Sequence, residues 1–258
     1  MIQIYLNSLI LIISLMTVLW IVSLLIKNVS IVDIFWGLGF VITNAYYYFA
    51  AGTFYPVPTI LFVMVFIWGV RLSGYLAWRN IGKEEDFRYQ EFRRKYGAKN
   101  YRFISFFQTF LLQGVLMWII SSTLLGVNIY ASAHGPTFLD YIGIIVWLTG
   151  LFFEAGGDLQ LARFKSNINN KGKVLNTGLW RYTRHPNYFG DSAVWWGYGL
   201  LCLSTGSYLL VIGSLLMTLL IIKVSGVALL EKTLKNRKPE YDEYIRKTSP
   251  FIPWFPKK

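Results

Sequence analysis

Long apolar stretches separated by short polar connections dominate this chain. A membrane-spanning helix needs about 20 mainly apolar residues. The stretches that approach or reach this length are residues 4–26, 29–50, 56–78, 104–126, 138–157, 189–205 and 207–230. The pattern predicts an all-α polytopic membrane protein with about seven transmembrane helices.

The composition agrees with a membrane protein and argues against a nucleic-acid partner. Only 15% of the 258 residues are charged and 55% are hydrophobic, whereas soluble domains carry about 25% charged residues. The formal net charge is +12, but the basic residues lie in gaps between apolar stretches and not on one folded face. We therefore expect no nucleic-acid partner.

The basic residues cluster in three segments, which predicts an orientation. Eight Lys and Arg lie between residues 79 and 102, six between 163 and 184, and eight between 232 and 258. Basic loops of membrane proteins face the cytoplasm. We therefore expect a cytoplasmic C-terminus, an N-terminus on the outside, and cytoplasmic loops that cover a cofactor cavity.

No internal repeat or shift in composition divides the chain, so we expect a single domain over residues 1–258. The two histidines, His134 and His185, are predicted on opposite sides of the membrane, and Cys202 lies in an apolar stretch. Because these residues cannot meet in one place, no metal site is expected.

Several acidic residues lie where the membrane should not tolerate them. Ionisable groups inside spanning helices are costly and are functional by default. Glu154 and Asp158 are four residues apart and therefore share a helix face. The alternative is that such acids only pair with loop bases at helix ends. The acids expected around one cytoplasm-facing cavity are Asp33, Glu154, Asp158, Asp191 and Glu231.

Arg71 lies well inside the third predicted span, where an arginine needs an acid or a phosphate as partner. Asp33, near the start of the second span, is the expected partner. A buried ion pair with a purely structural role is the alternative.

Residues 174–191 form a basic and aromatic segment that opens the sixth predicted helix. Pro186 and Asn187 are typical of a helix start, and a helix N-terminus favours an anion. The segment therefore predicts a phosphate-bearing cofactor, although an interfacial belt that anchors the helix at the lipid headgroups is the alternative. The charged, donor and flat side chains of this segment are Trp180, Arg181, Tyr182, Arg184, His185 and Tyr188.

Five motifs together resemble the membrane-embedded steroid 5α-reductase-like reductases, in particular their bacterial branch. The resemblance implies seven helices around a lipid-accessible cavity, cytoplasmic loops folded over NADPH, and a location in the bacterial inner membrane. It also implies reduction of a carbon–carbon double bond, which in the family lies in a 3-oxo-steroid. The motifs are Asp33-Ile34-Phe35-Trp36-Gly37, Trp68-Gly69-Val70-Arg71-Leu72, Glu154-x-x-x-Asp158, Gly178 to Asp191, and Leu229-Leu230-Glu231-Lys232 to Tyr244.

The resemblance also implies roles for individual residues. Asp33 and Trp68 stand where steroid-active members have a Glu and a Tyr that donate to the substrate ketone, and Tyr75 is a candidate to replace the lost hydroxyl. The expected catalytic residues are Asp33, Trp68, Arg71 and Tyr75. The expected cofactor-binding residues, mostly in the part from about residue 104 to 258, are Arg79, Glu154, Asp158, Lys165, Lys173, Tyr182, Arg184, His185, Asn187, Tyr188, Asp191 and Glu231.

These residues predict a specific arrangement of cofactor and substrate. NADPH is expected under the loops 79–103 and 158–186, with its phosphates against Arg79, Lys165, Lys173 and Arg184. A hydrophobic lipid or steroid-like molecule is expected to enter from the bilayer. Membrane lipids are the other expected partners, and no protein partner is predicted.

Two other functions fit the same sequence. The Arg-His-Pro-x-Tyr-x-Gly run that begins at Arg184 also resembles the isoprenylcysteine carboxyl methyltransferases, which bind S-adenosylmethionine. A non-catalytic membrane protein that binds a lipid is the third possibility.

Overall fold

Every regular element of the described residues is helical, as the apolar stretches predict. The structure is a computed structural model that describes residues 1–133, 135–225 and 241–257. Glu231, an expected cofactor-binding residue, lies outside the described residues. The chain forms two compact units, Met1–Gly135 with Thr205–Leu210 and Pro136–Ser204 with Val211–Lys258, and each is described by itself. The single functional domain expected over the whole chain stays a prediction.

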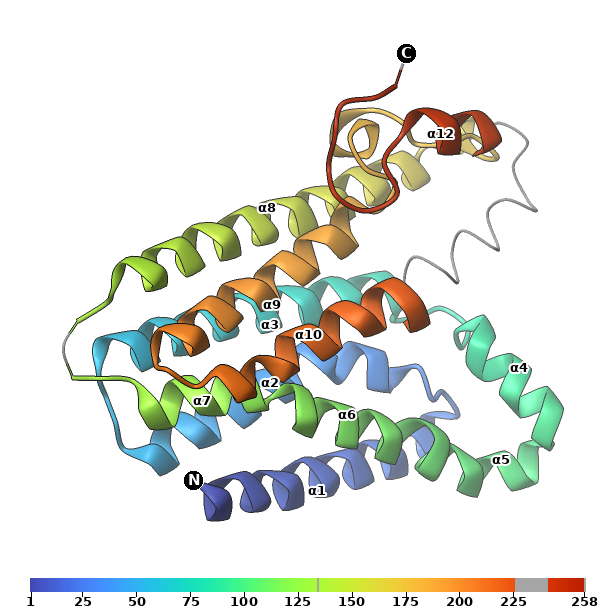
Figure 1. The fold of residues 1–258 in the computed structure, drawn as a ribbon. Coiled ribbons are helices and arrows are strands. Elements are labelled where there is room, and N and C mark those ends of the chain that lie inside the picture. The colour runs from blue at the N-terminus through green and yellow to red at the C-terminus, as the bar shows by residue number, and fades with distance from the viewer. Residues whose placement is uncertain (134, 226–240, 258) are drawn as a thin grey trace. The chain divides into compact units, whose positions relative to one another are not determined.

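The first unit contains three long helices and a fourth, segmented helical run. In the run, η1 is a π-helical segment between α5 and α6, and α1 packs beside α6 (Figure 1). The elements are α1 (Ile2–Ile26), α2 (Ile31–Ala51), α3 (Pro56–Asn80), α4 (Phe87–Tyr96), α5 (Ala98–Ser105), η1 (Phe106–Leu111), α6 (Leu112–Ile120) and α7 (Ser122–Tyr130), with η4 (Tyr208–Val211) ending at the boundary of the unit.

Helices α2 and α3 touch through their backbones. A Cβ atom added at Gly37 would lie 2.4 Å from the carbonyl oxygen of Gly69, and one added at Gly69 would lie 2.6 Å from that of Gly37. The Ser73 hydroxyl accepts a hydrogen bond from the amide of Leu38 (2.9 Å) at the same crossing. Asp33 lies one turn before this crossing on α2.

Within the described part of the chain, four helical segments are long and apolar enough to cross a membrane, so the chain is an integral membrane protein. The segments are Ile2–Ile26, Pro56–Asn80, Ala98–Tyr130 and Phe138–Ser166. The predicted spans at 29–50 and 189–205 form α2 and α9. These two helices are not among the four segments that are both long and apolar enough to cross a membrane. Tyr208–Val224 is a shorter apolar helix. The count of seven spans and the orientation stay predictions.

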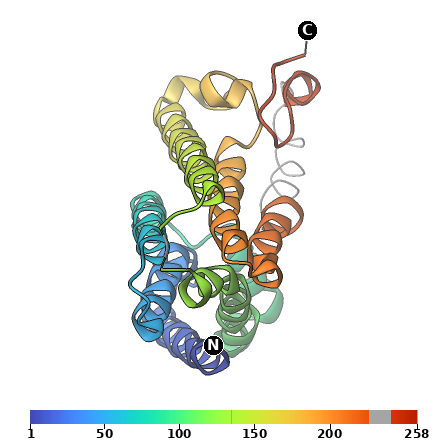
Figure 2. The same cartoon turned by 60° about the vertical axis from the view of Figure 1, so that its left-hand side comes forward.

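The second unit is built on two helices that run side by side, α8 and α9 (Figures 1 and 2). Helix α8 begins with a capping box in which Thr137 and Asp140 satisfy each other's backbone amides, and α9 begins at Pro186, as predicted. The elements are α8 (Phe138–Ser166), η2 (Ile168–Asn170), η3 (Gly178–Arg181), α9 (Pro186–Ser204), α10 (Ile212–Leu219), η5 (Leu220–Ser225) and α12 (Tyr241–Lys247).

Glycines spaced seven residues apart allow the close approach of α8 and α9. A Cβ atom at Gly150 would lie 2.5 Å from the amide nitrogen of Val194, and one at Gly190 would lie 2.3 Å from that of Glu154. Seven residues are close to two helical turns, so each set lies on one face of its helix. The glycines at the contact are Gly143, Gly150 and Gly157 on α8 and Gly190 and Gly197 on α9.

We expect Gly190→Ala to destabilise the second unit. The new methyl group would collide with the backbone of α8, and overpacking of this kind costs about 1–3 kcal/mol. Thermal unfolding of the purified protein in detergent measures the loss. Gly74→Ala on α3 is the matched control, because a Cβ atom there meets nothing within 4 Å, and a helical Gly→Ala change is stabilising by about 0.5–1 kcal/mol where space allows. Equal stability of the two variants would contradict the expected collision.

Candidate functional site

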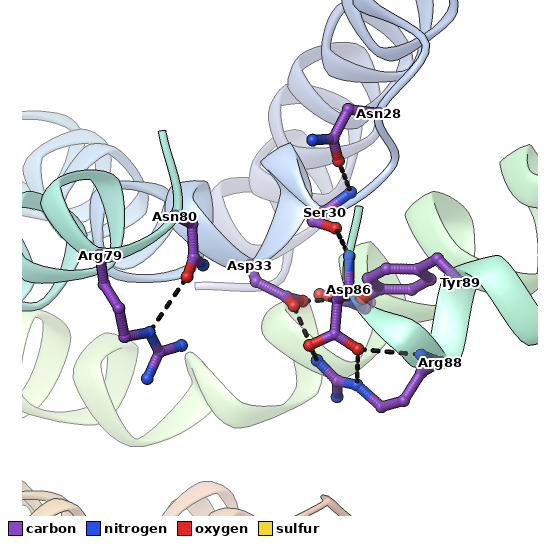
Figure 3. Close-up of polar contacts among 9 residues, drawn as sticks. Asn28, Ser30, Asp33, Arg79, Asn80, Asp86, Arg88 and Tyr89 are labelled. Atoms are coloured by element: carbon purple, nitrogen blue, oxygen red, sulfur yellow. Dashed lines mark hydrogen bonds and ion pairs between the residues drawn. The ribbon is translucent and has the colours of Figure 1, made fainter. Parts of the chain in front are cut away.

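The carboxylate of Asp33, on the first turn of α2, is held by two side chains of α4. Arg88 Nη2 donates to Asp33 Oδ2 at 2.9 Å, and the hydroxyl of Tyr89 donates to Asp33 Oδ1 at 2.8 Å (Figure 3). The Asp33 side chain retains 22% of its exposure and that of Arg88 34%. The acid is therefore positioned and partly accessible.

The pairing of Asp33 differs from the expected one. Arg71 on α3 was the expected partner, but the cation on Asp33 is Arg88 from the connection after α3. The reason lies in how α4 begins, because its first residues are bonded to the start of α2, where Asp33 lies.

Two acids attach the start of α4 to the turn between α1 and α2. The amide of Asp86 donates to the Ser30 hydroxyl (2.7 Å), and Glu85 Oε1 accepts from the amide of Val29 (2.8 Å). Asp86 also caps α4 by accepting from the amide (3.0 Å) and Nε (2.8 Å) of Arg88. The connection that carries eight basic residues is thereby held in place by its own acids.

Four residues of this network were not predicted from the sequence: Glu85, Asp86, Arg88 and Tyr89. One local signal was present, since an Asp directly before a helical segment is typical of an N-cap. The contacts of Arg88 and Tyr89 with Asp33 span 55 and 56 residues of chain. No local pattern reports contacts over such a distance.

The other expected catalytic residues lie on α3. Trp68, Arg71 and Tyr75 are spaced three and four residues apart, which places them on one helix face. Trp68 is fully buried and its ring packs 6.0 Å from that of Phe40, whereas Arg71 and Tyr75 are partly buried. Trp68 thus lies in the core of the unit.

Arg79, expected at the cofactor phosphates, is exposed at the end of α3. Its guanidinium lies 5.6 Å from the ring centre of Tyr75, and Nε donates to Asn80 Oδ1 at 3.1 Å. Figure 3 shows this contact between Arg79 and Asn80 beside the Asp33 network. Its expected phosphate contact stays a prediction.

The network also sets the protonation of its members. Burial opposes ionisation of Asp86, but the hydrogen bonds from Arg88 outweigh it and lower the pKa of the Asp86 carboxyl. Burial, followed by the charge of Asp33, raises the pKa of the Tyr89 phenol. Tyr89 is therefore a neutral hydrogen-bond donor.

Acid should release α4 from α2. Because the pKa of Asp86 is lowered in the folded protein, its stabilising contribution is complete above the ordinary aspartate pKa of about 4 and is lost as the pH falls below that value. Hydrogen–deuterium exchange protection of α4, corrected for the intrinsic pH dependence, should fall over this range. Asp86→Asn keeps an N-cap side chain but should remove the Asp86 part of the pH dependence. An identical acid profile in this variant would contradict the assignment.

The second unit gathers acids and an amide where α8 meets the start of α9. Glu154 and Asp158 are 3% and 5% exposed, one turn apart on α8, as predicted. Asn187 Nδ2 donates to Asp158 Oδ1 at 3.1 Å, and Asp191 lies one turn further along α9. Gly157 permits this approach, since a Cβ atom there would lie 3.0 Å from the amide nitrogen of Asn187.

These side chains fit the donor groups of a nucleotide cofactor. The Oδ1 atom of Asn187 is buried and accepts no hydrogen bond from any described residue, so it can receive one from a ligand. Carboxylates bind ribose hydroxyls in nucleotide sites, and Glu154 and Asp158 are suited to this role. Lys165 and Lys173, both exposed, are the cations of the following segment that suit phosphates.

Arg184 has a different environment from the one expected. It was predicted to bind phosphate, but its Nη1 donates to the carbonyls of Ile245 (2.9 Å) and Thr248 (3.2 Å), and its amide donates to that of Ser249 (2.9 Å). The side chain is only 7% exposed. Arg184 thus holds the C-terminal segment against the start of α9.

The remaining residues predicted in this segment are also tied into the unit. His185 is 2% exposed and its ring stacks on that of Tyr188, with 5.8 Å between centroids. Tyr182 is exposed and meets Phe255 edge-on at 6.1 Å. The Tyr244 hydroxyl donates to the carbonyl of Trp180. The segment is therefore held by contacts with the C-terminal residues and does not form a free loop.

The structure places the expected site residues in two groups. Those for catalysis, with Arg79, lie in the first unit, and the described ones for the cofactor lie in the second. Among the described residues no group of three or more His, Cys, Asp or Glu could hold a metal ion.

Comparison with known families gives one match over most of the chain. Residues 19–248 match the model of the family described as "Protein of unknown function (DUF1295)". No solved structure matches.

Three curated proteins are similar to this chain. An uncharacterized protein of Schizosaccharomyces pombe is 24% identical over 207 residues, which is 71% of this chain and 60% of the yeast protein. The steroid 5-alpha-reductase DET2 of Arabidopsis thaliana is 34% identical over 61 residues, 23% of each chain. The human 3-oxo-5-alpha-steroid 4-dehydrogenase 1 is 35% identical over 65 residues, 25% of this chain and 24% of the human one. The chain thus matches 60% of the yeast protein and about a quarter of each reductase.

Proposed function

We propose that this chain, which belongs to the steroid 5-alpha-reductase-like family DUF1295, is a membrane-embedded oxidoreductase that uses NADPH to reduce a carbon–carbon double bond. The proposed substrate is a hydrophobic steroid-like molecule, enone or other lipid. The names of the similar Arabidopsis and human proteins support this class of reaction.

The observation that carries the cofactor proposal is the buried amide oxygen of Asn187 beside Asp158. This oxygen accepts no hydrogen bond from the described residues, which is costly in a helix pair unless a ligand or water satisfies it, and the neighbouring Asp158 is 5% exposed. We assign Glu154, Asp158, Asn187 and Asp191 to the donor groups of NADPH. Lys165 and Lys173 are assigned to its phosphates.

When bound, NADPH would supply the hydride. The part of the protein is to hold the substrate carbonyl and to stabilise the negative charge that develops on its oxygen. In the first unit, we assign this role to the hydroxyl of Tyr89 together with Asp33. Arg88 holds the Asp33 carboxylate in place, and the neutral phenol can turn from Asp33 to the substrate. Tyr89 therefore replaces Tyr75 as the proposed hydroxyl donor, while Trp68 and Arg71 are assigned to the wall of the substrate site.

Cofactor binding separates this proposal from the other two functions. Purified protein in detergent is titrated with NADPH and, separately, with S-adenosylmethionine while its thermal stability is followed. Stabilisation by NADPH is expected. Stabilisation by S-adenosylmethionine alone would favour a methyltransferase, and no response to either would favour a lipid-binding protein.

Asn187→Ala should weaken NADPH binding by about tenfold, the loss of roughly one hydrogen bond to a ligand. Asn176→Ala is the matched control, because Asn176 is exposed. Binding measured by the same titration should be unchanged in the control. Equal affinity in both variants would remove Asn187 from the cofactor site.

Tyr89→Phe should lower kcat on an enone substrate by about a hundredfold, the usual effect of removing one donor to a developing oxyanion. The affinity for NADPH should stay the same, because Tyr89 is assigned only to the substrate. Tyr96→Phe, at the other end of α4, is the control. A loss of folding stability with unchanged kcat in the Tyr89 variant would make the contact with Asp33 structural.

A further inference from the structure

A polar cavity of about 350 Å³ lies in the first unit, at the end of α1. It is formed by the last turn of α1, by α4 and by the first turns of α5, and none of its lining residues is among those assigned above to the substrate or the cofactor. The polar residues that line it are Ser23, Lys27, Arg93, Tyr101, Arg102 and Ser105.

Positive charge in the cavity exceeds negative charge. Arg93 is paired with Glu85 through two hydrogen bonds of 2.9 and 2.8 Å. Lys27 and Arg102 line the same cavity, and their charged side-chain groups form no hydrogen bond or ion pair among the residues that the structure describes. The cavity therefore holds two uncompensated cations, which favour an anion.

A buried hydroxyl of the cavity also lacks a well-formed hydrogen bond. Tyr101 is fully buried, and its hydroxyl makes no hydrogen bond of normal geometry within the described part of the chain, where the Thr109 side chain lies within its reach. Buried polar groups without a partner are rare in folded proteins, so this hydroxyl calls for a ligand or a water molecule. Its ring is fixed by the Arg93 guanidinium, which lies 5.2 Å from the ring centre.

The start of α5 adds donors of a third kind. Ala98, the first residue of α5, lines the cavity, and the helix has neither a side-chain cap nor an acid in its first turn. Its first amides are therefore open, at the positive end of the helix dipole. Amides, cations and a phenol together form a site for the oxygens of a phosphate.

The position of the cavity favours a lipid as the source of that phosphate. Lys27 directly follows the candidate span Ile2–Ile26, and Ala98 begins the candidate span Ala98–Tyr130. The indole of Trp20 donates to the carbonyl of Arg102 at 2.9 Å, and tryptophans of this kind mark the membrane interface. Basic pockets between spanning helices at this level bind anionic headgroups.

We propose that this cavity binds the phosphate of an anionic phospholipid headgroup, at a site separate from the proposed cofactor residues. Lys27 and Arg102 neutralise the phosphate, while Tyr101 and the first amides of α5 donate to its oxygens. The bound lipid would bridge the ends of α1 and α5. The proposal stands on the first unit alone and does not depend on the reductase assignment.

The test compares four ligands on the full chain in detergent by thermal stability and native mass spectrometry. They are phosphatidylglycerol, phosphatidylcholine, inorganic phosphate and NADPH. Phosphatidylglycerol should stabilise the protein and stay bound, and phosphatidylcholine should do neither. The double variant Lys27→Gln/Arg102→Gln should bind phosphatidylglycerol at least tenfold more weakly and keep its affinity for NADPH.

The double variant Arg94→Gln/Lys99→Gln is the matched control. It removes the same number of charges from α4 and α5, at exposed positions that do not line the cavity, and should bind phosphatidylglycerol as the unchanged protein does. Tyr101→Phe tests the buried hydroxyl and should weaken binding without the change of charge.

Three results would overturn the proposal. Equal binding of phosphatidylcholine would show that no headgroup is selected, and equal losses in the two double variants would make the attraction a diffuse surface effect. A parallel loss of NADPH affinity in the cavity variant would assign the cavity to the cofactor. If inorganic phosphate alone binds with the same sensitivity to the variants, the phosphate site stands and the lipid source is wrong.

Discussion

The contact between the backbones of α8 and α9 determines the geometry of the second unit. In a membrane, apolar side chains give helices little reason to associate, and small residues that permit close packing take over that role. Gly150 and Gly190 leave no room for a Cβ atom on either helix, so the backbones themselves set the separation. That separation brings Asn187 to 3.1 Å from Asp158. The glycines thus allow the acids of α8 to approach α9, and the hydrogen bond from Asn187 to Asp158 joins the two helices at that point.

Charge has a comparable part in the first unit, at the connection after α3. Basic residues there predict a cytoplasmic loop, but Arg88 and Arg93 are bound to Asp33, Asp86 and Glu85 and hold α4 in place. Their contribution to a ligand site is therefore smaller than a count of charges suggests. Lys27 and Arg102, whose side chains form no ion pair among the described residues, lie instead at the cavity beside α1 and α5. An anion is therefore expected at this cavity and not at Arg88 or Arg93.

The predictable part of the molecule is the part set by local rules. Apolar length predicted the long helices, Pro186 predicted the start of α9, and the spacing of four residues predicted the shared face of Glu154 and Asp158. The partners of Asp33 and Arg184 could not be predicted, because they lie more than 50 residues away in the chain and depend on how a connection or a tail packs. The seven-residue spacing of the glycines is a pattern in the sequence that indicates the contact between α8 and α9. The same glycines explain why α9, although it carries polar residues, still packs closely against α8.

The environment of Asp33 bears on the proposed chemistry. The Asp33 carboxylate accepts from both Arg88 and Tyr89, and these two contacts fix its position. A phenol whose pKa is raised by burial and by that carboxylate stays protonated and is available as a hydrogen-bond donor. In the proposed reaction the two groups therefore differ in role: Asp33 orients the phenol, and Tyr89 donates to the oxygen that gains charge. Trp68, fully buried against Phe40, can supply packing at this site, while the exchangeable proton comes from α4.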